Sequence, residues 1–451
     1  MKSLSKGRIW LLAMGQLGWA MLSGLISNWL VYFYQPDEAA QAAGQTIFIP
    51  QGRVLLSVFT IIGAITALGR IFDAVTDPWI ASLSDRCKSA SGRRIPFLKW
   101  SSLPLAVSTV MVFCAPVGHI SAWNVAWLLI FILCYYLAIT AYCTPFNALI
   151  PELGHNQQER LSISTAISLT FIVGTAFAYV APVIWGMLEP QFGRILAMRI
   201  TFAGLAVIAF ICMQIPVFAI REKDYVHSQP AEGTAFSSLI KTFKNREFRL
   251  FVASDIFYWI GLTMFQTGLP FFVTSLLKLP ENMSTIFFVA MTALSLVFYV
   301  PVNLLTKRLG KKKLVLLAFM IFACCFGYTA LMGSALKIPA AAQGFILVAV
   351  AAFPMAIFGI LPQAMVADIS ESDAKKTGEN REGMFYAART FAFKLGQSVS
   401  MLLFTALATI GTNGMGYRIV AAASSALALI GGCILIFYNE KKIDQVIAET
   451  E

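Results

Sequence analysis

Charged residues are scarce in this sequence. Asp, Glu, Lys and Arg together make up 13% of the 451 residues, about half the share found in a typical soluble domain. So few charges do not cover a water-facing surface of this size. This excludes a soluble enzyme, a nucleic-acid-binding domain and a disordered scaffold as descriptions of the whole chain.

Residues that carry out chemistry are also few. The three histidines, His119, His155 and His227, lie in connections between apolar segments and share no motif. The eight cysteines show neither metal-ligand spacing nor a disulfide framework. No polar stretch is long enough to fold alone. We therefore expect neither an enzyme nor a bound cofactor.

Long apolar runs are abundant instead. Hydrophobic types reach 58%, and runs of this length without period-2 alternation predict membrane-spanning α-helices. The first run is too long for a signal peptide, so we take it as a membrane helix. The twelve runs have approximate bounds of 9–35, 53–84, 96–116, 121–150, 161–188, 196–220, 248–277, 283–306, 313–334, 339–367, 383–410 and 415–438. We expect an all-α membrane protein with twelve transmembrane helices.

The longest polar stretch lies between the sixth and seventh apolar runs. It predicts an N-terminal six-helix half at 1–220, a cytoplasmic central loop at 221–247 and a C-terminal half with a short tail at 248–451. The net charge of +11 comes from Lys and Arg in the connections. With the N-terminus inside, only six of these basic residues fall outside, namely Arg53, Arg194, Arg199, Lys278, Lys337 and Arg418. This asymmetry predicts two cytoplasmic termini in a cell or inner membrane.

The two halves resemble each other in their connections. The connection after the second run, 84–94, and the one after the eighth, 306–313, are both short, basic and glycine-containing. Likewise, 151–160 after the fourth run parallels 368–382 after the tenth. Two related six-helix halves predict a transporter with its site between the halves, near the midplane of the membrane.

Ionisable side chains within the apolar runs are costly unless they are paired or hydrated. Asp73, Thr76 and Asp77 are spaced i, i+3, i+4, so they share one helix face. Pro78 has no N–H, which removes the helical partner of the Ala74 carbonyl. Two carboxylates, a hydroxyl and a free carbonyl form an oxygen cluster suited to a small cation such as sodium.

The same charges have a second interpretation. Arg70 can pair with Asp73 along the helix, and Lys394 can pair with Asp77 between helices, which would form a structural ion-pair cluster. The two interpretations are compatible because a lysine can exchange with a cation as the partner of a carboxylate.

The eleventh run carries a further polar stripe. Arg389 precedes Lys394 by about one turn, and an arginine that faces a cavity is a receptor for carboxylates. Arg389 can instead pair with Glu382. Several aromatic residues, including Trp19 and Tyr142, could stack on a sugar ring, although the sequence does not distinguish them from core residues.

Three parts of the sequence carry a resemblance to a known family. They contain GRIFDAVTDP from Gly69, SDR from Ser84 and GRRIPF from Gly92, then PFNALIPEL from Pro145, and finally PQAMVAD from Pro362 with KTG and REG after it. The sequence resembles the glycoside–pentoside–hexuronide:cation symporters of the major facilitator superfamily, of which melibiose permease is the best-known member. This implies the major facilitator fold of two pseudo-symmetric halves.

The resemblance also implies roles for individual residues. The cation ligands would be Asp73, Thr76, Asp77 and Thr140, with sodium at Asp73 and Asp77. Lys394 falls where the family has a lysine beside that site, and Thr390 where it has a polar residue near the sugar.

The sugar site departs from that of melibiose permease. Its Lys–Asp pair is replaced by Trp19 and Ala20, its helix 4 Asp by Cys143 and its helix 5 Arg by Ser168, and the Trp after Pro-Phe by Asn147. Arg389 replaces a Gln, which favours an anionic sugar. The candidate substrate-binding residues are Arg389, Thr390, Trp19, Asn147 and Tyr142.

We therefore expect a monomeric secondary transporter that imports a sugar, glycoside or hexuronide together with Na⁺ or H⁺ and binds no nucleic acid. A lysolipid carrier of the same fold is the alternative, because such carriers also keep the helix 2 acids and the helix 11 lysine. We assign charged residues of the inner face to an inner gate that interlocks the halves, with topology-setting charge alone as the alternative. They are Asp85, Arg86, Arg93, Arg94, Glu152, Arg160, Asp368 and Arg381.

Overall fold

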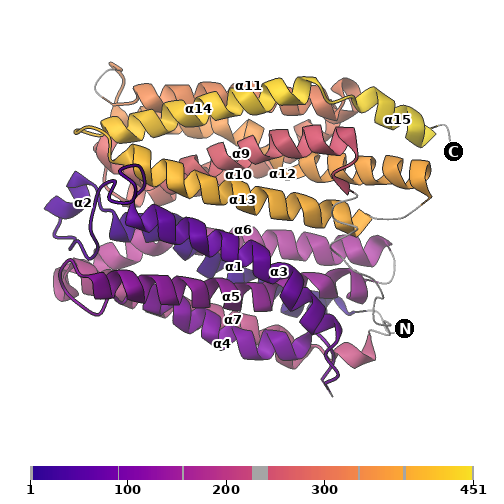
Figure 1. Ribbon diagram of the computed structural model, residues 1–451, viewed down its shortest axis with the longest axis horizontal. Coiled ribbons are helices and arrows are strands. Elements are labelled where there is room, and N and C mark those ends of the chain that lie inside the picture. Colours follow the sequence, from indigo (N-terminus) through magenta and orange to yellow (C-terminus); the bar gives the residue numbers. More distant parts are fainter. Residues whose placement is uncertain are drawn as a thin grey trace. The chain divides into compact units, whose positions relative to one another are not determined.

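The computed structural model describes residues 4–89, 91–154, 157–225, 242–333, 336–378 and 382–448 (Figure 1). Within these ranges the chain is mainly helical, and the strand-like pairings are two isolated bridges, Leu55 with Phe59 and Ser89 with Gly92. The predicted central loop at 221–247 includes residues 226–241, which lie outside the described part, so its assignment stays a prediction.

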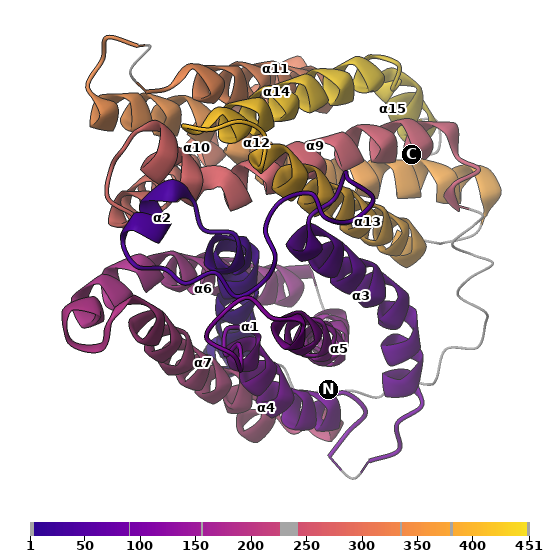
Figure 2. The ribbon, with the colours of Figure 1, turned by 60° about the vertical axis from the view of Figure 1, so that its left-hand side comes forward.

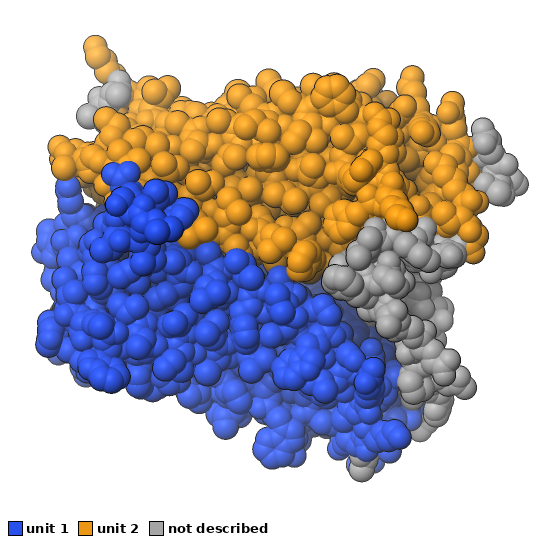
Figure 3. Space-filling model, in the orientation of Figure 1, with its two compact units in different colours: residues 1–232 blue, residues 233–451 orange. Residues whose placement is uncertain are grey.

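The chain divides into two compact units, residues 1–232 and 233–451, which are coloured separately in Figure 3. The helices of the first unit (Figures 1 and 2) are α1 (Lys6–Tyr34), α2 (Glu38–Ala42), α3 (Ile61–Asp85), α4 (Ile95–Val112), α5 (Ala122–Leu153), α6 (Gln157–Phe192), α7 (Arg194–Ala219) and the 3₁₀ turn η1 (Glu222–Asp224).

The second unit begins its described helices with α9 and ends with a short amphipathic helix, α15. Its helices are α9 (Arg246–Phe271), the π-helical turn η2 (Phe272–Leu276), α10 (Asn282–Leu309), α11 (Lys311–Leu331), α12 (Ala340–Thr377), α13 (Glu382–Ala408), α14 (Met415–Ile436) and α15 (Glu440–Ala448).

Eleven of the helices in the described part are long and apolar enough to cross a membrane. The remaining long helix is α3, with 25 residues. It falls outside that group because Arg70, Asp73 and Asp77 interrupt its apolar sequence. With α3 included, the described residues form six long helices in each unit. The prediction of an all-α, twelve-helix protein is confirmed.

The same helix pairs pack together in both units. In the first unit, α1 contacts α6 and α7, α5 contacts α3 and α4, and α4 contacts α7. In the second unit, α9 contacts α13 and α14, α12 contacts α10 and α11, and α11 contacts α14. Counting long helices from the start of each unit, these are the same five pairs. The repeat predicted from the connections therefore extends to the packing of whole helices.

The second apolar run begins its helix later than predicted. The sequence predicts a helix from residue 53, whereas α3 begins at Ile61. Leu56 and Ser57 have positive φ angles, which a helix does not accommodate. Thr60 then caps α3 by accepting a hydrogen bond from the N–H of Gly63. Hydropathy alone does not reveal that residues 53–60 are a loop, because this loop is itself apolar.

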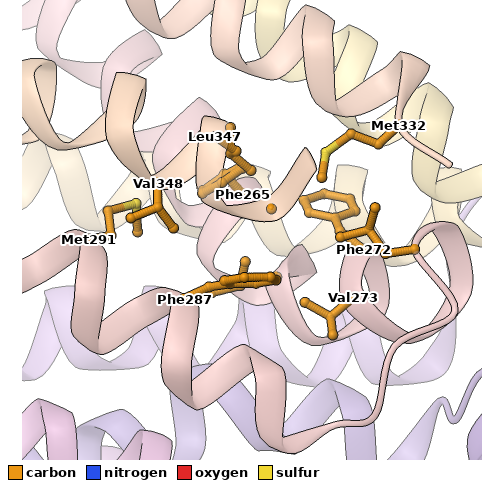
Figure 4. Close-up of a pocket in the computed structure, with 11 residues that line it drawn as sticks. Phe265, Phe272, Val273, Phe287, Met291, Met332, Leu347 and Val348 are labelled. Atoms are coloured by element: carbon orange, nitrogen blue, oxygen red, sulfur yellow. The ribbon is translucent and has the colours of Figure 1, made fainter. Parts of the chain in front are cut away.

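A small void lies at one end of the second unit, beside η2 (Figure 4). Its volume is about 10 Å³ and its lining side chains are apolar, among them Phe265, Phe272 and Phe287. Gly344 approaches the Phe287 ring so closely that a Cβ would lie 2.1 Å from it. The void is only about one water molecule in size and offers that water no polar partner, so we interpret it as a feature of packing.

Candidate cation-binding site

Two carboxylates of α3 accept hydrogen bonds from threonine hydroxyl groups of α5 within the first unit. Thr140 donates a hydrogen bond of 2.5 Å from its Oγ1 to Oδ1 of Asp73, and both residues are buried. One turn further along both helices, Thr144 donates from its Oγ1 to Oδ1 of Asp77 at 3.2 Å. The two acids and the two threonines are each spaced i, i+4, so they form a ladder between the helices. Hydrogen bonds donated to carboxylates stabilise the charged form.

Sequence reasoning identified three members of this ladder but not Thr144. A polar residue four positions after Thr140, on the same face of an apolar helix, is the signal that could have found it. The prediction that Thr76 is a cation ligand stays a prediction. Its hydroxyl donates to the carbonyls of Phe72 and Asp73, at 3.0 and 3.1 Å, within its own helix. Its oxygen lone pairs are the part left for a ligand.

Close packing of α3 on α5 makes the ladder possible. Gly69 faces the ring of Tyr136, and a Cβ at position 69 would lie 2.4 Å from that ring. Arg70 follows, with its guanidinium 5.4 Å from the centre of the same ring. Its Nη2 donates to Oγ of Ser27 on α1 at 3.3 Å. Arg70 thus places positive charge one turn from Asp73.

The oxygen atoms gathered at this site suit a small hard cation as ligands. It offers two carboxylates and threonine oxygens, and Pro78 leaves the Ala74 carbonyl without its helical donor. Oxygen ligands of this kind select hard ions. The described residues contain no group of three or more His, Cys, Asp or Glu that could hold a metal. A cation here would depend on hydroxyl and carbonyl oxygens as well as on the two acids.

Arg389 of α13 lies in the second unit and holds a carboxylate of its own. Its Nε and Nη2 contact the two oxygens of Asp255 on α9, at 2.7 and 3.0 Å, and both side chains are buried. The guanidinium also lies 5.7 Å from the centre of the Phe251 ring. Sequence reasoning offered a substrate carboxylate or Glu382 as the partner, and the structure provides Asp255. Thr390 and Lys394 follow on α13 and are half-buried.

The aromatic candidates differ in their surroundings. Tyr142 is fully buried and its hydroxyl donates to the Met213 carbonyl at 2.9 Å, which gives it a structural role within the first unit. Asn147 is exposed. Trp19 packs against Phe171 with ring centres 5.9 Å apart, and its indole N–H is buried without a hydrogen-bond partner among the described residues.

Trp259 in the second unit repeats the situation of Trp19. Each tryptophan lies thirteen residues beyond the first residue of the first long helix of its unit. Trp259 stacks on Phe393 of α13 at 4.8 Å, as Trp19 contacts Phe171 of α6, and its indole N–H is likewise buried without a partner in the described part. α6 and α13 are the fifth long helices of their units, so they hold the same position in the repeat.

The predicted gate residues of the first unit pair with one another. Arg94 donates to Asp85 at 2.5 Å and to Glu152 at 3.0 Å, and it also bonds Ser84. Arg93 reaches the same oxygen of Glu152 at 3.1 Å. These contacts join the end of α3, the start of α4 and the end of α5. A role for this cluster in interlocking the two halves stays a prediction.

The corresponding contact in the second unit joins Asp368 of α12 to Lys311 at the start of α11. Lys311 is a member that sequence reasoning missed. Arg86 is exposed. Arg160 lies in α6 but its side chain is outside the described residues, and Arg381 lies outside them altogether.

A carboxylate beyond the last long helix caps the third helix of each unit. Glu222 accepts the backbone N–H groups of Arg93, Arg94 and Ile95, at 2.8, 2.8 and 3.1 Å. Glu440 accepts those of Lys311 and Lys312, at 2.6 and 3.2 Å. Each cap satisfies orphan donors at a helix N-terminus and places negative charge at the positive end of its dipole. Burial raises the pKa of Tyr438, two residues before Glu440, so its phenol remains protonated.

The opposite ends of these helix pairs are joined in a similar way. Arg199 of α7 donates to the carbonyls of Phe113 and Ala115 beyond the end of α4, at 3.0 and 3.1 Å. Arg418 of α14 donates to the carbonyl of Ala330 at the end of α11, at 2.7 Å. The last long helix of each unit is therefore fastened to the third at both ends.

Two repeated units of six long helices are the architecture of transporters of the major facilitator superfamily. The family described as MFS/sugar transport protein matches residues 11–438, so this chain belongs to that family. The chain is therefore a multi-pass membrane transporter and not an enzyme.

Relatives and solved structures agree with this class. An uncharacterised symporter of Bacillus subtilis, YjmB, is 27% identical over 83% of this chain and 80% of its own length. The isoprimeverose transporter of Lactiplantibacillus pentosus is 23% identical over 95% of this chain and 87% of its own. A crystal structure of the nucleoside transporter NupG superimposes with a TM-score of 0.71 at 12% identity, covering 96% of this chain and all of that one, and shows the shared fold.

Proposed function

We propose that this protein is a symporter that uses the ladder of Asp73, Asp77, Thr140 and Thr144 to couple a cation, Na⁺ or H⁺, to the uptake of a sugar or glycoside. The observation that carries the proposal is the pair of acids on one face of an apolar helix, each holding a hydroxyl of α5. The sugar belongs to the proposal because of the family and because one relative, matched over 87% of its length, is an isoprimeverose transporter.

The cation would act by neutralising the two acids. A pair of carboxylates one helical turn apart in an apolar surrounding is costly in free energy when both are charged. A bound cation offsets this repulsion and favours the conformation that takes up substrate, and the loaded carrier then changes its access from one side to the other. The coupling is reciprocal, so substrate must tighten cation binding by the same factor.

Trp19, one of the predicted substrate-binding residues, is the residue we favour for contact with the sugar. It offers an indole N–H donor without a partner among the described residues and a ring face for stacking. Trp259 has the same two properties at the repeat-related position of the second unit. Thr390 and Asn147 remain candidates, whereas the structural hydrogen bond of Tyr142 argues against it as a contact.

A neutral substrate fits the structure better than an anionic one. The guanidinium of Arg389 is already matched by the carboxylate of Asp255, so the pair adds no net charge. The reason to expect a hexuronide was an unmatched arginine near the sugar. We therefore favour neutral glycosides, including disaccharides and pentosides.

The test is uptake into proteoliposomes with sodium and proton gradients imposed separately. Labelled isoprimeverose, melibiose, xylose and glucuronate form the panel. We expect one gradient to drive accumulation of a neutral member, and Asp77→Asn to abolish that accumulation. Asp444→Asn, at an exposed carboxylate of α15, is the matched control and should leave uptake unchanged. Unchanged gradient-driven accumulation in Asp77→Asn would contradict the assignment of the cation site.

The lysolipid carrier is the second candidate, since this chain lacks the principal sugar-binding acids of melibiose permease. Uptake of labelled lysophosphatidylcholine by the same proteoliposomes distinguishes the two. Sodium-driven lysolipid entry without uptake of any sugar in the panel would favour it.

We propose that the termini face the cytoplasm and that the chain acts as a monomer, since each unit carries six long helices among the described residues.

A further inference from the structure

A groove on the first unit lies outside everything assigned above. It runs between the first half of α4 and the last turns of α7, which lie side by side (Figure 2), and its volume is about 930 Å³. This is the upper part of the range for sites that bind small organic molecules. Its lining residues are Lys99, Trp100, Leu103, Pro104, Phe210, Ile211, Gln214, Ile215, Phe218 and Ala219.

The groove lies on the surface of a membrane-spanning bundle. Trp100 and Phe218 are exposed by 74% and 79% and Ile211 by 56%, so large apolar side chains face outward along it. In a protein that crosses a bilayer, such a face contacts acyl chains. The groove is therefore a place where an acyl chain can lie against the protein along its length.

The polar end of the groove carries a positive charge. Lys99 is exposed, and its ammonium group lies 5.4 Å from the centre of the Trp100 ring, held there by a cation–π contact. Tryptophan and lysine side by side are typical of the level of the lipid headgroups. Arg221 follows the lining residue Ala219 by two positions and is also exposed, which adds positive charge at this end.

The floor of the groove is held in a fixed geometry. Gln214 of α7 donates from Nε2 to the Lys99 carbonyl at 3.1 Å and to Oγ of Ser102 at 2.6 Å. Below it, the cap by Glu222 fastens the end of α7 to the start of α4. The two walls are thus joined by hydrogen bonds that do not depend on an occupant, so the groove is preformed.

We propose that this groove binds one phospholipid with an anionic headgroup, its phosphate beside Lys99 and its acyl chains along Phe210, Ile211 and Phe218. The charge of Lys99 selects an anionic over a zwitterionic headgroup, because one basic side chain near the membrane surface favours an anionic lipid about fivefold. The site is separate from the proposed cation ladder, so lipid binding can be measured whether or not transport is driven by sodium.

Native mass spectrometry of the purified full chain tests this site. After delipidation, the protein is titrated with phosphatidylglycerol or phosphatidylcholine that carries the same palmitoyl and oleoyl chains. We expect one phosphatidylglycerol to bind about fivefold more tightly than phosphatidylcholine. Lys99→Gln should lower the preference, and Lys88→Gln, at another exposed lysine of the same end, should keep it.

A second pair of variants tests the shape of the groove. Ile211→Trp places a larger side chain in the groove, across the path of the acyl chains, and should weaken binding of both lipids, whereas Ile208→Trp, exposed on α7 but outside the groove, should not. In vesicles, phosphatidylglycerol with brominated chains should quench tryptophan fluorescence more than its phosphatidylcholine counterpart, and Trp100→Phe should abolish the difference. Equal binding of both lipids by the wild-type chain would overturn the proposal. So would a dimer that occupies this face, or unchanged binding in both Lys99→Gln and Ile211→Trp.

Discussion

At the scale of single residues, the ladder between α3 and α5 pairs each acid with one hydroxyl. A hydroxyl fulfils two tasks there, since it donates to the carboxylate and keeps lone pairs for a cation. The pairing of Asp77 with Thr144 extends the site by one turn beyond the residues that the family resemblance implies.

Replacement of Thr144 tests this extension. Thr144→Val removes the hydroxyl with little change in volume, and we expect the cation concentration for half-maximal uptake to rise about tenfold, the value of one hydrogen bond to a charged group. Thr144→Ser retains the hydroxyl and should remain within about twofold of the wild type, since the bond it preserves carries the effect. Equal cation dependence in all three proteins would show that Thr144 lies outside the cation site. The measurement is sugar uptake as a function of cation concentration in proteoliposomes.

The buried pair of Arg389 and Asp255 predicts a loss of stability rather than a change in substrate. Arg389→Gln leaves the Asp255 carboxylate buried without its partner, which costs about 3–5 kcal/mol. The melting temperature of the purified protein should fall, and the double variant with Asp255→Asn should recover most of it. If Arg389 instead serves mainly to bind an acidic sugar, the melting temperature of Arg389→Gln will stay unchanged while uptake of glucuronate is lost.

At the scale of elements, the approach of α3 to α5 depends on a residue without a side chain. Gly69→Ala places a Cβ against the Tyr136 ring, where only 2.4 Å is available. The same ring also contacts the guanidinium of Arg70 and the ring of Tyr135. Overpacking of this kind costs about 1–3 kcal/mol and moves helices apart. We expect a large loss of gradient-driven uptake together with only a small fall in the melting temperature. The reason is that the hydrogen bond between Thr140 and Asp73 is the first contact to lengthen.

Gly204→Ala is the matched control for this substitution. A Cβ at Gly204 of α7 meets no atom within 4 Å, so the substitution should leave uptake unchanged. Wild-type uptake in Gly69→Ala would show that the site tolerates a wider helix separation.

The carboxylate caps of α4 and α11 predict equal behaviour of two distant residues. Glu222→Ala and Glu440→Ala should each lower stability by about 1–2 kcal/mol, the usual value of a helix cap. The glutamine variants should retain part of it because an amide oxygen still accepts a hydrogen bond. Asp224→Ala, two residues beyond Glu222 and exposed, is the control. Thermal unfolding in detergent measures the difference, and an unchanged melting temperature in both alanine variants would contradict the role of the caps.

At the scale of the whole molecule, the distribution of Lys and Arg predicts the orientation. If both termini face the cytoplasm, green fluorescent protein fused after Glu451 will fold and fluoresce in cells, and alkaline phosphatase fused there will be inactive. The reverse pattern would place the termini outside. A fusion of each reporter within the connection between α4 and α5 provides the control, since it should give the opposite result.

The sequence predicted the fold well because its strongest signal, the length of apolar runs, is a local property. It was weaker where geometry depends on distant residues. The start of α3 was missed because an apolar loop reads like a helix. The pairing of Arg389 with Asp255, 134 positions away, is visible only in the folded unit. Glu222 and Glu440 were missed for the same reason, since nothing local distinguishes a capping acid from any other charge near a helix end. Lys311 was missed because its partner, Asp368, lies 57 positions away.

The caps by Glu222 and Glu440 have a consequence for biosynthesis. Each acid lies after the final long helix of its own unit and closes a helix that was translated much earlier. The N-terminus of the third long helix therefore stays uncapped until the last long helix of the same unit has been translated. Glu222 emerges while about half of the polypeptide is still to be made, so the first bundle can finish assembling in the bilayer before the second bundle has been inserted.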